Sequence, residues 1–135
     1  MPEEKTEIQV AETRWAIATD WFTVNRRSAW VLVKDYLCPD CAKRLGLKKE
    51  PPLKTLFASI ESCCSQAPDF ITDKMPIMES AFRLFLRNGN RPMTLQEVSS
   101  KLGQLRYGDI YRTSPETLRR LLKNDLFYGL REITG

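Results

Sequence analysis

Four cysteines are the residues with the clearest chemistry in this sequence, and all of them lie between positions 38 and 64. Cys38 and Cys41 have the C-x-x-C spacing of a zinc knuckle, in which one backbone turn lets two thiolates face a tetrahedral metal. Cys63 and Cys64 form a second, adjacent pair. Neighbouring residues of a helix point about 100° apart, so joint binding by this pair requires a distorted helix end. The sequence predicts one structural zinc ion bound by Cys38, Cys41, Cys63 and Cys64.

Reduced thiols and a redox-active C-x-x-C pair are the alternatives to zinc. A redox-active pair of this spacing lies between a strand and a helix, as in thioredoxin, whereas Cys38 is expected to end a helix. Zinc would supply folding free energy to a half of the chain with a small core, and no catalysis. The sequence contains no histidine, which removes Ser-His-Asp catalysis, Cys-His catalysis and histidine-bound metals. We therefore expect no enzymatic activity.

Capping and turn residues predict the elements that position the cysteines. A helix capped by Ser28 is expected to run to Leu37. Pro39 is expected to end this helix and to open a loop over residues 38–41. A lysine-rich irregular linker is predicted over 43–52, and the apolar spacing of three and four predicts a helix over 53–62. The aromatic residues before this region are expected to fill a core: Trp15, Trp21, Phe22 and Trp30.

The second half of the chain is predicted to contain three helices and a short strand. Thr94 and Glu97 form a capping box, in which each side chain satisfies a backbone amide at the start of the second helix. Gly103 is expected to end this helix. Ser114 followed by Pro115 is typical of a helix start. The predicted elements are a helix over 76–87, a helix over 94–103, a helix that begins at 114, and a short strand over 126–133.

This order of elements resembles a winged helix-turn-helix, and most of all the module found in the delta subunit of bacterial RNA polymerase and in some restriction-endonuclease fusions. The resemblance covers residues 75–133 and rests on three segments with the sequences AFRLFL, PMTLQEV and TSPETLRRLL: Ala81–Leu86, Pro92–Val98 and Thr113–Leu122. The sequence departs from the pattern in a long segment between the last two helices and in a stretch after Ile133 that is too short for a full wing hairpin. We expect a mainly α-helical chain in three parts: a flexible arm over 1–13, a helical zinc-binding region over 14–70, and a winged-helix-like three-helix domain with a short C-terminal strand over 71–135.

The resemblance implies that the third helix recognises double-stranded DNA. Its leucines are expected to point inward, which exposes the polar residues Thr117, Arg119, Arg120, Lys123 and Asn124, with Arg112 just ahead of the cap. Arginine can bond guanine bidentately and asparagine can pair with adenine, while lysine and threonine hold phosphates. Arg106 and Tyr107 are expected to reach the DNA backbone. The implied function is that of a transcriptional regulator, with a homodimer as a further expectation because two half-sites restore specificity.

The charge distribution is compatible with DNA as a partner and also with a protein partner. Residues 70–135 carry eleven Lys/Arg against seven Asp/Glu, whereas residues 1–69 are balanced, so the second half holds the whole net charge of +4. A basic half favours an anionic partner. The same face is also typical of a solvated amphipathic helix, or of an adaptor that docks on a protein such as RNA polymerase.

The chain is expected to be cytoplasmic and not to insert into a membrane. Its longest uninterrupted apolar run is Ala29–Val33, which is far too short to span a bilayer. The first residues are acidic and are followed by no apolar segment, unlike a secretory signal peptide.

Overall fold

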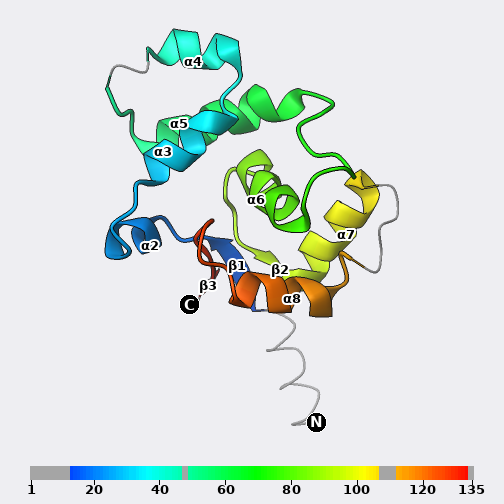
Figure 1. Cartoon of the computed structure of the whole chain (residues 1–135). Helices are drawn as coiled ribbons and strands as arrows, with labels where there is room; N and C mark the ends of the chain where they lie inside the picture. Colours follow the sequence, from blue (N-terminus) through cyan, green and yellow to red (C-terminus); the bar gives the residue numbers. More distant parts are fainter. Residues whose placement is uncertain (1–12, 47–48, 107–111, 134–135) are drawn as a thin grey trace.

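The computed structural model describes residues 13–46, 49–106 and 112–133. The predicted arm over 1–13 therefore lies outside the described residues, except for its last one. Helices dominate the described chain, and short strands complete it (Figure 1). In chain order the elements are β1 (Arg14–Ile17), α2 (Thr19–Val24), α3 (Ala29–Val33), the 3₁₀ turn η1 (Lys34–Tyr36), α4 (Pro39–Leu45), α5 (Leu53–Ser62), the 3₁₀ turn η2 (Cys64–Gln66), α6 (Ile77–Arg87), β2 (Met93–Thr94), α7 (Leu95–Leu105), α8 (Pro115–Lys123) and β3 (Leu130–Ile133).

Most predicted helix starts are confirmed, because they depend on local side-chain caps. The Ser28 hydroxyl accepts a hydrogen bond from the Val31 amide at the start of α3. At the start of α7 the Thr94–Glu97 capping box is complete, with both reciprocal hydrogen bonds formed. Ser114 caps α8 with Pro115 in its first turn. Helix α5 spans the predicted residues 53–62.

Four predicted boundaries are wrong. The α-helix capped by Ser28 ends at Val33 and not at Leu37, and the chain continues as the 3₁₀ turn η1. Pro39 begins a helix, α4, instead of opening a loop, because a proline at the first helical position has no amide hydrogen that needs a partner. The predicted irregular linker consequently starts with the last residues of α4. Helix α7 continues through Gly103 to Leu105, since packing outweighs the intrinsic cost of a glycine of about 1 kcal/mol. The final strand is shorter than its apolar sequence suggested and begins at Leu130.

The small antiparallel sheet joins the two ends of the described chain. Its strand order is β2-β1-β3, so that β1 lies in the middle. Trp15 of β1 is paired with Met93 of β2 on one side and with Glu132 of β3 on the other. The side-chain amide of Asn90 extends the pairing, because it accepts from the Ile17 N–H at 2.8 Å and donates to the Ile17 carbonyl at 2.9 Å. The first strand is thus held by segments more than seventy residues away.

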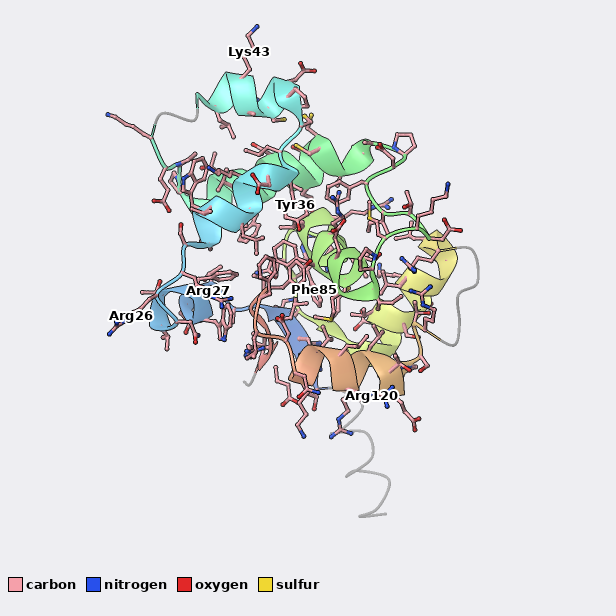
Figure 2. All side chains as sticks on the ribbon, viewed as in Figure 1. Arg26, Arg27, Tyr36, Lys43, Phe85 and Arg120 are labelled. Carbon is pink, nitrogen blue, oxygen red and sulfur yellow. The ribbon has the colours of Figure 1, made fainter. Side chains whose placement is uncertain are left out.

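One hydrophobic core runs through the described part of the chain. Helix α6 lies at its centre, between the layer of α3 and α5 and the layer of α7, α8 and the sheet (Figure 1). Phe85 of α6 is fully buried, and the Tyr36 ring of η1 packs against Phe82 of the same helix, with ring centroids 5.2 Å apart (Figure 2). The predicted core role of the aromatic residues is confirmed for Trp15 and Phe22, which are buried, while Trp21 and Trp30 pack half-buried against the core. Helices α4 and α8 lie at opposite ends of the molecule (Figure 1).

Candidate metal centre

The first two cysteines lie at the beginning of α4. Cys38 is the cap residue before the helix, in an extended conformation, and Cys41 is the third helical residue. Gly46 ends α4 in a left-handed conformation with φ of 60°, which a glycine adopts without steric cost. The expectation that Cys38 ends a helix is therefore wrong. Both sulfurs of the C-x-x-C motif lie at a helix N-terminus, where backbone amides favour negative charge.

Three sulfur atoms from two helices meet at one point. The Sγ atoms of Cys38, Cys41 and Cys63 all lie within 4.8 Å of one another. The Cys38 and Cys63 Sγ atoms are 3.9 Å apart. Two thiolates bound to one tetrahedral zinc at about 2.3 Å lie about 3.8 Å from each other, so this separation already has the length of a tetrahedral edge.

Cys64 lies beside this group of three sulfurs, directly after the residue that ends α5. The backbone of Cys63 has φ of −132° and ψ of −67°, outside the helical range, and the chain then continues as η2. This conformation departs from a regular helix, in which the side chains of neighbouring residues point about 100° apart. The Cys64 Sγ is buried and accepts a hydrogen bond from the Cys38 backbone N–H at 3.1 Å. The distorted helix end required for joint binding is thus present.

All four cysteines lie among the described residues and are free thiols. They differ in exposure: Cys41 and Cys64 are buried, Cys38 is half-buried and Cys63 is exposed. A guanidinium group lies beside one of the buried sulfurs, because Arg44 Nη2 is 3.5 Å from the Cys41 Sγ, one turn further along α4. Donors of this kind orient metal-bound thiolates and stabilise their charge. Sequence reasoning missed Arg44, although its position three residues after Cys41 in a helix is the available signal.

The electrostatic environment of the cluster favours ionisation of the Cys38 thiol and opposes ionisation of the other three thiols. The Cys41 backbone amide donates to the Cys38 sulfur and, with hydrogen bonds from neighbouring thiols, lowers the pKa of Cys38 to about 7. Interaction with Cys41 and then Cys38 raises the pKa of Cys63 to about 11. Burial raises the pKa of Cys41 and of Cys64. Four adjacent thiols therefore do not ionise together unless a cation compensates their charge, and the cluster can hold a metal ion.

The predicted DNA-contacting residues lie on or next to α8. Leu118 and Leu122 of this helix are fully buried against α7 and β3, whereas the cationic side chains face solvent. Arg120 points away from the body of the molecule (Figure 2). The exposed members of the predicted set are Arg112, Arg119, Arg120, Lys123 and Asn124. They lie far from the cysteines, at the other end of the molecule (Figure 1).

Two of the predicted DNA-contacting side chains form hydrogen bonds at the ends of α8. Thr117 is half-buried, its N–H donates to the Ser114 hydroxyl, and its own hydroxyl lies 2.9 Å from that of Ser114. Asn124 is the C-cap, and its side-chain amide donates to the Arg120 carbonyl at 2.9 Å. Both side chains therefore contribute to helix termination or initiation in this structure.

The expectation that Arg106 contacts DNA is wrong, because this residue is 1% exposed. Its guanidinium group donates to the backbone carbonyls of Thr72, Asp73 and Met75 and to the Ser80 hydroxyl, at 2.7–3.1 Å. The side chain thus attaches the end of α7 to the segment that precedes α6. Tyr107, the other residue expected to reach the DNA backbone, lies outside the described residues.

The turn that joins α8 to β3 is organised by a buried carboxylate. One oxygen of Asp125 accepts from the N–H groups of Phe127 and Tyr128, and the other accepts from the Leu130 N–H, each at 2.9 Å. This turn fixes α8 relative to the sheet. It also leaves Leu126 and Phe127 exposed to 72% and 56%, an unusual degree for large apolar residues.

Comparisons with protein-family models, with curated proteins and with solved structures found no match to this chain. Among the described residues, none of the helices has the length and apolar character needed to cross a membrane.

Proposed function

We propose that this protein is a non-enzymatic DNA-binding protein, a transcriptional regulator, that places α8 in the major groove of double-stranded DNA. The observation that carries the proposal is the division of α8 into two faces. Leu118 and Leu122 are fully buried, and the opposite face exposes Arg119, Arg120 and Lys123. A short helix held firmly by its apolar face, with cationic side chains outward, is the arrangement of a recognition helix.

The arrangement of elements around α8 supports the same proposal. Helix α6, strand β2, helices α7 and α8, and strand β3 follow one another in the order of a winged helix-turn-helix. That fold uses a third strand from a C-terminal hairpin. Here β1 occupies the central place in the sheet, antiparallel to both β2 and β3, and supplies a third strand from the other end of the chain. We infer that the domain is a winged helix whose strand pair has no connecting wing loop.

The metal proposed for the cysteine cluster is zinc. Its donors are four sulfur atoms, and soft thiolate ligands in tetrahedral geometry favour zinc or an iron–sulfur cluster. A single zinc ion fits the 3.9 Å separation of the Cys38 and Cys63 sulfurs, which is one tetrahedral edge. Four protein ligands leave no open position for substrate, so the ion has a structural role. Its place is the junction of α4 and α5, which it holds together.

Binding to duplex DNA of random sequence tests the proposed function. Fluorescence anisotropy with a labelled duplex should show binding at low salt that weakens steeply as salt increases, because binding releases counterions from the phosphates. A zinc-loaded, folded protein that shows no salt-dependent binding contradicts the proposal.

An adaptor that docks on another protein, such as RNA polymerase, is the second candidate function. The exposed Leu126 and Phe127, directly after α8, favour it, because apolar side chains at the surface are typical of protein interfaces. Replacement of both by serine should leave DNA affinity unchanged and reduce partner binding if this surface is a docking site.

A further inference from the structure

The four sulfurs of the proposed zinc site are divided by their exposure into two pairs. The Cys41 and Cys64 sulfurs are buried, and each lies beside a donor: the Arg44 guanidinium at 3.5 Å and the Cys38 backbone amide at 3.1 Å. The Cys38 and Cys63 sulfurs form the outer pair, half-buried and exposed, with 3.9 Å between them. A reagent in solution therefore meets the outer pair first.

We propose that the outer pair, Cys38 and Cys63, is an oxidation site at which hydrogen peroxide forms a disulfide and thereby releases the metal. The inference rests on the proposed zinc site. Oxidation of cysteine follows thiolate character and exposure, and in the metal-bound site all four sulfurs are thiolates. The greater exposure of Cys38 and Cys63 then makes them react before the buried pair. Because their sulfurs lie close together, the product is a disulfide between them.

The reaction consumes one peroxide and two protons. The exposed Cys63 sulfur attacks a peroxide oxygen, the O–O bond breaks, hydroxide leaves, and a sulfenic acid forms. The Cys38 sulfur then attacks the Cys63 sulfur, the S–S bond forms, and the S–O bond breaks with loss of a second hydroxide. The two sulfurs lose two electrons, the peroxide gains two, and two protons from solvent convert both hydroxides to water. Closing a separation of 3.9 Å to a bond of about 2.05 Å requires movement of side chains at a helix start and a helix end.

Release of the metal removes the ion that holds Cys41 of α4 to the cysteines at the end of α5. Only two sulfurs remain for the metal, which is too few for a stable structural zinc site. Within α4, whose residues are all described, Cys41 is the only buried side chain, and Leu45 packs half-buried. Oxidation is therefore expected to loosen α4 beyond its first residues, while the new disulfide keeps the Cys38 cap attached to the end of α5. Helix α8 lies at the opposite end of the molecule and keeps its own buried leucines (Figure 1).

The test uses the full chain, purified with zinc or reconstituted with it, and hydrogen peroxide as the only oxidant. Zinc release is followed with a chromogenic chelator, and disulfides are located by peptide mass mapping. We expect one zinc released for each peroxide consumed, a dominant Cys38–Cys63 disulfide, and recovery of zinc binding after reduction with dithiothreitol. Zinc retained in excess peroxide overturns the inference, as does a dominant Cys38–Cys41 or Cys63–Cys64 disulfide. A chain that binds no zinc before peroxide is added contradicts the proposed zinc site itself and, with it, this inference.

Two further measurements locate the effect. The variant Cys63→Ser removes the more exposed sulfur together with one zinc ligand, so its test follows the thiols and not the metal: at the peroxide dose that forms the disulfide in the wild type, peptide mass mapping should find Cys38 outside any disulfide. A disulfide between Cys38 and Cys41 or Cys64 in the variant at that dose contradicts the pairing. Limited trypsin digestion of the oxidised wild type should accelerate at Lys43 and Arg44 of α4 and not at Arg119 and Arg120 of α8, which serve as the internal control. Equal acceleration at both helices would show general unfolding and overturn the local mechanism.

Discussion

The backbone N–H of Cys38 donates a hydrogen bond to the Sγ of Cys64, at 3.1 Å. This contact joins the start of α4 to the end of α5 and brings two pairs of cysteines together across a separation of more than twenty residues. An amide directed at sulfur stabilises a thiolate. The contact thus places the Cys64 sulfur beside the group formed by the sulfurs of Cys38, Cys41 and Cys63.

Zinc content is the first expected result. Protein purified without a metal-binding tag should contain close to one zinc per chain by elemental analysis. Removal of the metal with a chelator should lower the melting temperature, because free zinc about 1,000-fold above its Kd adds about 4 kcal/mol to the free energy of unfolding. Added zinc should restore it. A fully folded protein with no metal and an unchanged melting temperature contradicts the site.

The pH dependence of the metal-free protein follows from the shifted pKa values. The folded chain lowers the pKa of Cys38 from 9.0 to about 7, so this group stabilises the metal-free fold above about pH 9 and loses that effect as the pH falls through 7. The raised pKa of Cys63, about 11, has the opposite sign: its contribution is present below about pH 9 and is lost as the pH rises through 11.

Alkylation with iodoacetamide separates the two groups. In the metal-free protein at pH 8, Cys38 should react faster than Cys63 although Cys63 is the more exposed thiol, because only the thiolate is nucleophilic. The rate at Cys38 should be half-maximal near pH 7. Faster alkylation of Cys63 at this pH would show that exposure outweighs ionisation and that the assigned pKa order is wrong.

Arg106 should be among the most important residues for stability. Its replacement by alanine leaves three backbone carbonyls without their donor, in a site where the side chain is 1% exposed, and should cost about 3 kcal/mol in the free energy of unfolding. The exposed Arg87 is the matched control, and Arg87→Ala should change stability by less than about 0.5 kcal/mol. Chemical denaturation measures both. Similar small values for the two variants would contradict the structural role of Arg106.

Alanine substitutions at two glycines with positive φ distinguish the effect of backbone strain on stability from the effect of side-chain packing. A methyl group at Gly129 would lie 2.6 Å from Phe22 Cε2, whereas one at Gly46 meets no atom within 4 Å. Replacement of either by alanine places a side chain in the left-handed region at a cost of about 1 kcal/mol. Gly129→Ala should cost about 2 kcal/mol more because the Phe22 ring must move. Equal melting temperatures for the two variants would show that the ring yields without cost.

Local signals in the sequence predicted most of the helices, and long-range contacts explain the rest. The capping box at Thr94 and the helix start at Ser114 depend on residues within four positions, and both are present as expected. Proline at position 39 has two opposite local interpretations, a stop and a first helical residue, and only the packing of Cys41 selects the second. The central place of β1 could not be predicted, because its partners are β2 and β3 near the other end of the chain.

The candidate site was predictable in composition and not in geometry. Four cysteines in one short region indicated a metal centre, but the break of α5 at Cys63 that allows adjacent cysteines to converge is visible only in the backbone. Arg106 was misassigned because an arginine next to a polar loop is usually exposed, and its burial depends on carbonyls more than twenty-five residues away. The positions on α8 followed from its leucine spacing alone.

The measurement that tests the proposed function most directly is the salt dependence of DNA binding by two triple variants. Replacement of Arg119, Arg120 and Lys123 by alanine removes three exposed charges from α8, and replacement of Lys43, Lys54 and Arg87 removes three exposed charges elsewhere. Both variants should fold normally, since surface substitutions typically cost within about 0.5 kcal/mol each. The α8 variant should lose affinity for duplex DNA, with a slope of log affinity against log salt that is smaller by up to about 0.9 for each phosphate contact removed. The control variant should keep the wild-type slope, and equal slopes for the two variants would contradict recognition of DNA by α8.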